Sequence, residues 1–308
     1  MSKIKISILL IVSFIICSFC NSEIQIKYKI DDKIVTNIDI LEEKKYLIFL
    51  RPNLAKLSEN EIIKISENSI VREIIKSKEI DRIFKKKENK NFTNEIKRNL
   101  FLFKGVKSEE EFLKILKETN LEYKKILKKI EYEGLWNELI FQKYNNLIKI
   151  DKEEIKKNLI KNYDNNKRYE YNLSEILFEV EQDENFDKKY QEIINYIKIN
   201  EFKVAASKYS ISNSSNKGGE IGWIKETVLS SDLIEKLKKL KINEVSEPIR
   251  YPNGYLLIKI NNKKEMKQKI NLERELGESI KYEKNKQLNQ FSLLFYKKIK
   301  QNTVINEY

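Results

Sequence analysis

The stretches Gly218-Gly219-Glu220-Ile221-Gly222-Trp223 and Gly254-Tyr255-Leu256-Leu257-Ile258-Lys259 decide the fold of one part of this chain. They hold four of its seven glycines, which permit turns that a side chain would obstruct. The apolar residues after each glycine group are typical of strands. Upstream, residues 171–180 indicate another strand, and the residues around Ile193 and Ala205 indicate two helices. Residues 168–263 are therefore expected to form one compact α/β domain.

The sequence before this domain has the pattern of a helical protein. Only 7 Gly and 3 Pro occur among 308 residues, which favours long helices. Ser58 and Glu61 have the spacing of a helix-starting capping box, and Ser108 and Glu111 repeat it. Apolar residues then recur with helical spacing through residues 58–84, 108–116, 121–147 and, after Asp151, to about residue 163. We expect a helical N-terminal domain over residues 23–167.

Residues 24–52 and 264–308 carry shorter patterns of secondary structure. Residues 24–28 alternate apolar and polar side chains and are followed by Ile34-Val35, which predicts a strand hairpin before a helix that begins near Thr36 and ends at Pro52. Residues 264–308 predict a helix and a closing strand at 303–305. Because a lone helix and a short strand are marginally stable, we expect them to dock on the N-terminal domain. The expected fold class is α+β: a mainly helical N-terminal domain completed by a C-terminal helix, plus the compact α/β domain.

The charge and the missing histidine exclude several kinds of chemistry. Lys and Arg number 60 and Asp and Glu 47, so the net charge is 60 − 47 = +13, and the sequence contains no histidine. Imidazole-based catalytic triads and His-ligated metal sites are therefore excluded. The positive charge would suit a nucleic acid, an anionic membrane or an acidic polypeptide. Lys and Glu are interspersed, however, as on solvated helix faces, so charge alone nominates no partner.

The first 22 residues have the layout of a secretory signal peptide. Lys3 and Lys5 precede an apolar run over residues 6–17, and small or polar residues follow up to Ser22. The run is short for a membrane span, although a retained anchor is an alternative. Lipid attachment at Cys20 is another, but bulky Phe19 fits poorly before it. Cleavage near Ser22 would leave an exported protein without cysteine, because Cys17 and Cys20 are its only two.

The α/β segment resembles the parvulin-type peptidyl-prolyl isomerases. The resemblance rests on Leu173-Ser174-Glu175-Ile176-Leu177-Phe178, on Phe202, Ala205-Ala206 and Tyr209-Ser210, and on the two stretches quoted first. The start of the mature chain, residues 29–39, the helical N-terminal domain and the returning C-terminal helix resemble the SurA family of periplasmic chaperones. Members often carry two parvulin domains, and this chain has room for one. The resemblance implies a periplasmic foldase or holdase that receives unfolded outer-membrane proteins.

The resemblance also assigns a substrate-binding socket. The apolar socket positions of the parvulin pattern fall on Leu229 and Leu233, with Trp223 and Leu256 nearby in the pattern. Such a socket holds the proline ring while the enzyme binds the twisted amide, so no covalent step, metal or other cofactor is required. The alternative for all four residues is ordinary core packing.

The polar centre departs from the parvulin pattern. The two family histidines map to Glu175 and Leu256, and the Cys or Asp position maps to Ser212. Glu175 and Ser212 are therefore the candidate catalytic residues; the alternatives are a solvated strand residue and a loop hydroxyl that caps nearby backbone. We expect weak or absent isomerase activity on a retained peptide-binding fold. An ATP-independent chaperone, consistent with the lack of a P-loop, is the first hypothesis; an active isomerase is the second, and a nucleic-acid-binding protein is disfavoured by export.

Overall fold

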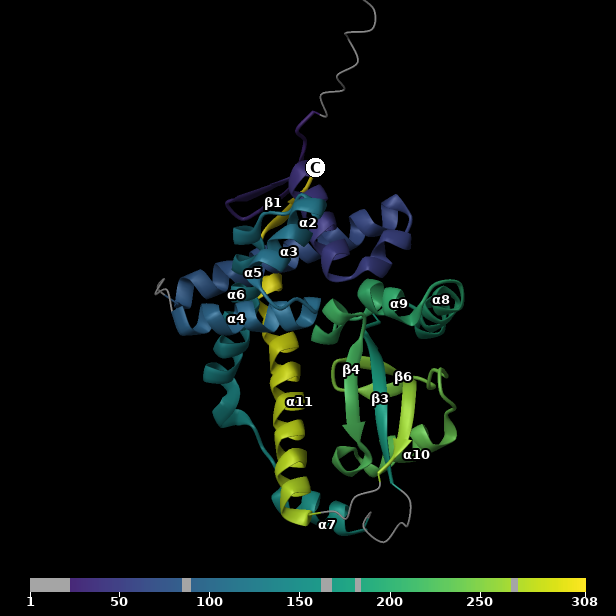
Figure 1. Cartoon of the computed structure of the whole chain (residues 1–308). Coiled ribbons are helices and arrows are strands. Elements are labelled where there is room, and N and C mark those ends of the chain that lie inside the picture. The colour runs from purple at the N-terminus through teal and green to yellow at the C-terminus, as the bar shows by residue number, and fades with distance from the viewer. Residues whose placement is uncertain (1–22, 85–89, 162–167, 181–183, 267–270) are drawn as a thin grey trace, which may run out of the picture.

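The computed structural model describes residues 23–84, 90–161, 168–180, 184–266 and 271–308. The predicted signal peptide, residues 1–22, lies outside the described residues. Figure 1 shows a helical part and a separate sheet domain, with one long C-terminal helix, α11 (Leu272–Gln301), running beside both. The expected α+β fold class is confirmed, and the position of α11 decides how the two parts meet.

The described part of the chain begins with the predicted hairpin. Strands β1 (Ile26–Ile30) and β2 (Lys33–Thr36) pair antiparallel, and the turn between them includes Asp31 at a positive φ of 52°. Helix α2 (Asn37–Leu50) follows at once because Thr36 and Asp39 form a reciprocal capping box. Pro52 begins the short 3-10 helix η1 (Pro52–Lys56), so α2 stops where the sequence predicts.

Five further helices complete the helical part before the sheet domain. They are α3 (Glu59–Ile83), α4 (Lys90–Lys104), α5 (Glu109–Thr119), α6 (Tyr123–Tyr144) and α7 (Lys152–Lys161), with the 3-10 turn η2 (Asn145–Leu147) after α6. Helix α4 was not predicted. Ser108 caps α5 as expected, accepting a hydrogen bond from the Glu111 amide. The Ser58 box is wrong in detail, because its hydroxyl donates to the Glu61 carboxylate rather than accepting from the backbone.

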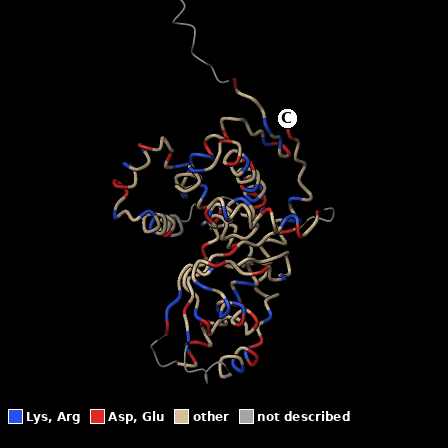
Figure 2. Tube along the Cα trace, turned by 90° about the vertical axis from the view of Figure 1, so that its right-hand side faces the viewer, with Lys and Arg blue, Asp and Glu red and all other residues tan. Residues whose placement is uncertain are grey.

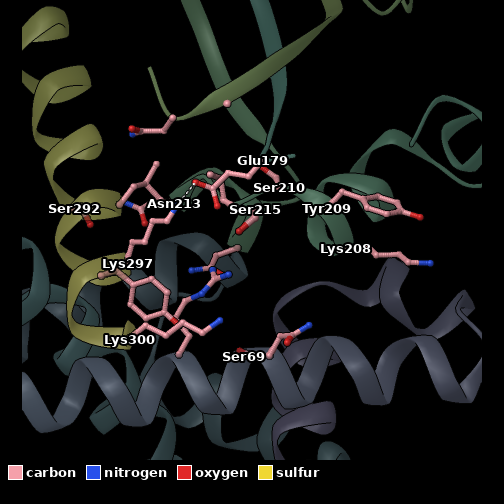
Figure 3. A pocket seen from close by; sticks show the side chains of 18 of the residues that line it. Ser69, Glu179, Lys208, Tyr209, Ser210, Asn213, Ser215, Ser292, Lys297 and Lys300 are labelled. Atoms are coloured by element: carbon pink, nitrogen blue, oxygen red, sulfur yellow. Dashed lines mark hydrogen bonds and ion pairs between the residues drawn. The ribbon is translucent and has the colours of Figure 1, made fainter. Parts of the chain in front are cut away.

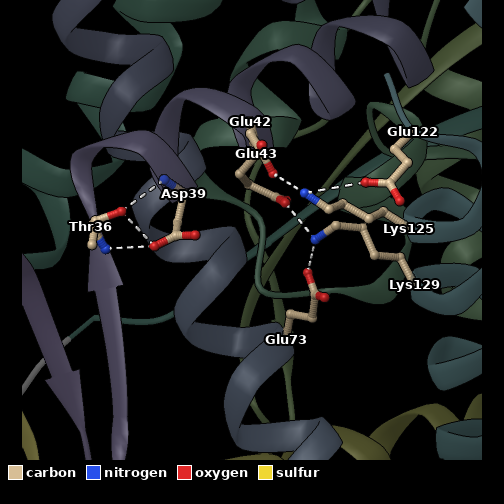
Figure 4. A network of polar contacts seen from close by, with 8 residues as sticks. All are labelled: Thr36, Asp39, Glu42, Glu43, Glu73, Glu122, Lys125 and Lys129. Carbon is tan, nitrogen blue, oxygen red and sulfur yellow. Dashed lines mark hydrogen bonds and ion pairs between the residues drawn. The ribbon is translucent and has the colours of Figure 1, made fainter. Parts of the chain in front are cut away.

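A buried polar contact joins three helices of this part. The Lys129 ammonium of α6 lies between the carboxylates of Glu43 on α2 and Glu73 on α3, at 2.7 Å from Glu43 (Figure 4). Burial disfavours the charge on Lys129, yet the two carboxylates hold its pKa above the ordinary value. Glu43 is almost fully buried, so removing Lys129 would leave its charge without a compensating partner in the interior.

Helix α11 completes the helical core. Trp136 of α6 is fully buried, stacks on Phe295 with ring centroids 5.6 Å apart, and donates its indole N–H to Ser292 at 2.8 Å. After α11, strand β7 (Ile305–Glu307) pairs with β1, giving the sheet order β2-β1-β7. The closing strand exists, although it lies two residues beyond the predicted 303–305. The C-terminal segment therefore docks on the helical part, as expected.

The sheet domain is an antiparallel four-stranded sheet of order β4-β3-β6-β5. Its strands are β3 (Tyr169–Phe178), β4 (Glu220–Lys225), β5 (Ile249–Tyr251) and β6 (Gly254–Glu265), and its helices are α8 (Phe186–Ile199), α9 (Phe202–Tyr209) and α10 (Ser231–Lys239). Two 3-10 turns, η4 (Asn213–Lys217) and η5 (Glu226–Val228), flank β4. The sequence predicted β3, α8, α9 and the glycine-flanked strands, but not α10.

Successive side chains of β3 point to opposite faces of the sheet, which divides the core of this domain in two. Ile176 and Phe178 face α8 and α9, where they pack with Ile193 and Ala205. Tyr171, Leu173 and Leu177 face the other side, together with the residues of α10. We call these the α8–α9 face and the leucine face. Both faces are buried, so the sheet is the centre of the domain rather than its surface.

Charge is spread over the molecule. Figure 2 shows Lys and Arg interspersed with Asp and Glu along both parts of the chain, which agrees with the solvated helix faces expected from the sequence. Within the described ranges, none of the helices has the length and apolar character needed to cross a bilayer.

Candidate functional site

The two candidate catalytic residues lie together. Glu175 projects from the middle of β3, and the Ser212 hydroxyl donates a hydrogen bond of 2.6 Å to its Oε1 atom. Ser214 donates a second hydrogen bond of 2.8 Å to the same oxygen. The two serines come from the start of η4, which follows α9. The carboxylate is half-buried, so these hydroxyls replace part of the water that it would otherwise bind.

Gly219 sets the distance between β3 and the turn that carries these serines. Its carbonyl accepts a hydrogen bond of 2.8 Å from the Glu175 amide, and its φ is +80°. A Cβ atom at this position would lie 2.3 Å from the Glu175 carbonyl oxygen. No other residue fits there without moving the backbone. The glycine predicted to permit a turn therefore also places the polar centre.

The Ser212 hydroxyl makes two contacts, one of which is the backbone cap named above as the alternative to a catalytic role. The hydroxyl donates to Glu175, and the same oxygen accepts from the Ser214 amide at 3.4 Å as the N-cap of η4. A hydroxyl both donates and accepts, so the two contacts are compatible. An ionised carboxylate can accept hydrogen bonds but cannot donate them. The centre can therefore receive hydrogen bonds from a bound peptide, but it lacks the imidazole donors of the family pattern.

Three of the four predicted socket residues meet on the leucine face. Leu229 and Leu256 are 5% and 7% exposed, and Leu233 on α10 packs against them half-buried. They share this core with Leu173 and Ile258. Side chains this little exposed belong to the packed core. Leu229 and Leu256 therefore show the ordinary core packing that was named as the alternative to substrate contact.

Trp223 is not part of that socket. It pairs across the sheet with Asn172, whose neighbours Tyr171 and Leu173 point to the leucine face, so the indole lies on the opposite side of the sheet. The side chain is 42% exposed, and the Lys264 ammonium lies 4.3 Å from the ring centroid. Trp223 is near the socket residues in the sequence pattern but lies on the other sheet face, because residues adjacent in a strand alternate between faces.

Helix α11 covers the leucine face. Its residues Tyr282 and Leu293 pack against the core that contains Leu229 and Leu256. Polar contacts hold it there: the Glu275 carboxylate pairs with Lys225 at 2.8 Å and accepts a hydrogen bond of 2.7 Å from Thr227. Figure 1 shows α11 running beside β4. The face that would bind a proline ring is thus in contact with the chain's own helix.

Two tyrosines that pack against the core of the leucine face, Tyr251 and Tyr282, have raised pKa values. Burial raises the pKa of Tyr251 to about 12. A hydrogen bond from Gln290 opposes this rise, and the negative charges of Glu175 and Glu283 add to it. Burial also raises the pKa of Tyr282, and the neighbouring Tyr251 hydroxyl and the Glu175 charge add to the effect. Both hydroxyls therefore stay neutral near pH 7.

Sequence reasoning missed Ser214, Tyr251, Tyr282 and Gln290. The spacing of Ser212 and Ser214, two residues apart in a turn, could have indicated a paired donor for Glu175. Tyr282 gave no local signal, because its position depends on how α11 packs against a domain that ends before it. Among the described residues, His, Cys, Asp and Glu side chains form no group able to hold a metal ion.

The chain is similar in sequence to a protein family and to several curated proteins. Residues 172–262 match the rotamase family, the PPIC-type PPIase domain. Chaperone SurA of Buchnera aphidicola is 28% identical over 257 residues, which cover 75% of this chain and 56% of that protein. Chaperone SurA of Pseudomonas putida is 29% identical over 102 residues, covering 31% of this chain and 24% of its relative. Foldase protein PrsA of Bacillus subtilis is 35% identical over 104 residues, 30% of this chain and 35% of that protein.

A solved SurA-like chaperone of Campylobacter jejuni aligns over 92% of this chain and 98% of its own, at 16% identity and a TM-score of 0.36. The aligned regions span 24%, 35% and 56% of the length of three curated SurA relatives. The chain is therefore SurA-like in sequence and carries a parvulin-type domain, within a helical arrangement completed by α11.

Proposed function

We propose that this SurA-like chain is an ATP-independent periplasmic chaperone that binds unfolded outer-membrane proteins and has weak or lost prolyl isomerase activity. The similarity to SurA chaperones and PrsA foldases supports the chaperone class. The predicted export signal supports the compartment. We further propose residues 168–263 as the limits of the parvulin-like domain and residues 264–308 as the segment that returns to the helical part.

The packing of Tyr282 against the leucine face is the single observation that carries the loss of isomerase activity. X-Pro rotation has a barrier of about 18–20 kcal/mol, which an isomerase lowers by binding the twisted amide better than the planar one. That requires an open apolar socket and oriented hydrogen-bond donors. Here α11 packs against the core that contains Leu229 and Leu256, and the family imidazoles are replaced by Glu175 and Leu256.

Exposed apolar side chains on the helical part offer a surface for unfolded segments. Leu102 and Phe103, adjacent near the end of α4, are 71% and 54% exposed, and Leu113 on the following helix is 42% exposed. Scattered exposed apolar residues are ordinary, but adjacent ones favour contact with another apolar chain. Modest affinity at such sites would let a client leave as it folds, which suits a compartment without ATP.

An active isomerase remains the second candidate because the fold brings Glu175, Ser212 and Ser214 into one hydrogen-bonded group beside the socket. If α11 moved away, this group would border an apolar surface made by Leu229, Leu233 and Leu256. The two candidates therefore differ in whether the leucine face is reached by a peptide.

Two measurements on the full mature chain distinguish these candidates. In the first, an unfolded outer-membrane protein is diluted from denaturant, and light scattering records its aggregation with and without the chain. In the second, the relaxation rate of a proline peptide is measured beside a blank and an active parvulin. Suppressed aggregation without faster relaxation is expected. Unsuppressed aggregation would contradict the chaperone, and clear acceleration would establish the isomerase.

A further inference from the structure

A cavity of about 1010 Å³ lies where the two parts of the molecule meet. Its walls come from α3, from the last turns of α11, and from the sheet domain around Ser207–Asn216 and Arg250–Tyr255. Figure 3 shows Lys297 and Lys300 of α11 on one side and Ser210, Asn213 and Ser215 of the sheet domain facing them. We call this cavity the interpart cleft. It lies outside the Glu175 centre described above.

The charge of the interpart cleft is one-sided. Seven Lys or Arg residues line it, against one carboxylate, Glu179. Three of these cations have carboxylate partners: Lys76 pairs with Glu133 at 3.2 Å, Lys208 with Glu61 at 3.1 Å and Lys297 with Glu179 at 3.0 Å. For the other four, no ion pair exists with any carboxylate in the described part of the chain; they are Arg51, Arg72, Arg250 and Lys300.

Arg51 gives the strongest evidence that the cleft suits an anion. Its Nη1 atom donates to the Ser207 hydroxyl at 2.6 Å and to the Ser215 carbonyl at 2.8 Å, both neutral acceptors. Its Nε atom is buried and has no hydrogen-bond partner among the described residues. Burial lowers the pKa of Arg51 to about 10, a fall that nearby Glu43 and Tyr46 limit and Arg72 increases. A buried guanidinium normally gains a carboxylate or more donor contacts.

Arg72, Arg250 and Lys300 surround the same space with few polar partners. Arg72 lies over the Tyr296 ring at 5.9 Å, and Arg250 donates to the Tyr255 hydroxyl at 2.6 Å. These partners leave guanidinium donors for a ligand. Apolar residues, including Ile65, Val71 and Leu294, line the same cleft. A lining of cations and aliphatic side chains suits an extended polypeptide that carries carboxylates.

We propose that the interpart cleft binds carboxylates of unfolded polypeptide clients, either Asp and Glu side chains or the C-terminal carboxylate. This inference rests on the proposed chaperone function and names the client chemistry that one part of the molecule recognises. Arg51 and Arg72 donate guanidinium N–H groups to the carboxylate, and Lys300 and Arg250 add long-range attraction from opposite walls.

Three fluorescent, unstructured peptides test the proposal by anisotropy with the full chain. The first is built of Gly, Ser and Asp with an amidated end. The second replaces Asp with Asn, and the third is the Asn peptide with a free C-terminal carboxylate. The Asp peptide, the free-end peptide or both are expected to bind at least about tenfold more tightly than the amidated Asn peptide. The two carboxylate arms identify which source the cleft prefers.

Two charge-matched double variants locate the binding. Arg72→Gln with Lys300→Gln removes two cleft cations and is expected to abolish the carboxylate preference. Arg98→Gln with Lys298→Gln removes two exposed cations away from the cleft and should retain it. Arg250→Gln tests the opposite wall separately, in case the first pair disturbs α11. Equal binding of all three peptides, or an equal loss in the control pair, would overturn the proposal.

The aggregation assay separates this inference from the function on which it rests. If the chain suppresses aggregation of the outer-membrane protein but binds acidic and neutral peptides equally, only the cleft proposal fails. If it prefers acidic peptides through Arg72 and Lys300 but suppresses no aggregation, only the chaperone proposal fails.

Discussion

The Ser212 hydroxyl donates a hydrogen bond of 2.6 Å to the Glu175 carboxylate across 37 positions of sequence. Glu175 lies at a family histidine position on β3, and Ser212 lies at the family Cys or Asp position after α9. Two of the three polar positions of the parvulin pattern are thus still joined by a hydrogen bond, whereas the third carries Leu256, which lies in the apolar core. A carboxylate with two serine donors replaces the imidazole network.

Replacing Ser212 is expected to destabilise the sheet domain modestly. Ser212→Ala removes one donor to a half-buried carboxylate and the side-chain cap of η4, and should cost about 1–2 kcal/mol of unfolding free energy. Urea unfolding followed by circular dichroism measures it. Ser230→Ala is the control, since Ser230 begins α10 without a side-chain cap bond. Equal losses in both variants would contradict the importance of the Glu175 contact.

Shortening Tyr282 should uncover the leucine face. Tyr282→Ala removes an aromatic side chain that packs on the core containing Leu229 and Leu256, so affinity for a proline-rich peptide should rise while thermal stability falls. Lys281→Ala changes the exposed neighbouring residue on α11 and should alter neither. Isothermal titration with the peptide measures the effect. Unchanged affinity in a folded Tyr282→Ala protein would mean that α11 does not restrict access.

Alanine substitutions at Gly219 and Gly222 distinguish the cost of backbone strain from the cost of a steric clash. Both have positive φ, but only at Gly219 would a Cβ meet backbone, 2.3 Å from the Glu175 carbonyl. Gly222→Ala should cost about 1–2 kcal/mol, whereas Gly219→Ala should cost more, by several kcal/mol. Chemical unfolding of both variants tests this order. Similar losses would indicate that the turn beside β3 relaxes freely.

Trp223→Phe should leave peptide binding unchanged. The indole lies on the sheet face opposite the socket leucines, beside Lys264. The same titration with a proline-rich peptide, in the Tyr282→Ala background that opens the leucine face, is the appropriate measurement. A Leu233→Ala variant in that background should weaken binding. A loss with Trp223→Phe as large as that with Leu233→Ala would place the tryptophan in the socket after all.

Glu61 links the helical part to the sheet domain in a pH-dependent way. Burial alone would raise its pKa, but hydrogen bonds from Ser58 and Lys208 lower it to about 2, against 4.5 for the free group. A lowered folded-state pKa means that the contact contributes its full stability above about pH 4.5 and loses it as the pH falls through about 2. Lys208 lies on α9, so acid should weaken the attachment between the parts.

Comparison with Glu61→Gln isolates this contribution from other carboxylates. At about pH 6 the parent protein should exceed the variant in unfolding free energy by about 1 kcal/mol, allowing for solvent screening of a contact near the surface. Near pH 2 the difference should disappear. A difference that stays constant between these pH values would show that the Glu61 charge does not hold the two parts together.

The local elements were predictable wherever a short sequence contains its own cause. Thr36 and Asp39 form a capping box within four residues, and Pro52 stops α2. The strands of the sheet domain follow from apolar runs bounded by glycine. Helix α4 and helix α10 were missed, and only a family resemblance, not spacing, linked Glu175 with Ser212.

The sequence by itself determined the composition of the site: no imidazole, a carboxylate at Glu175, hydroxyls at Ser212 and Ser214, and leucines for the socket. Only the tertiary structure decided access and charge. It placed Tyr282 of α11 against the leucine face, turned Trp223 to the opposite face, and gathered Arg51, Arg72, Arg250 and Lys300 around one cleft. The reason is physical: capping and strand propensity act over a few residues. The cleft, by contrast, joins segments more than two hundred residues apart, such as those of Arg51 and Lys300, whose approach depends on how whole helices and sheets pack.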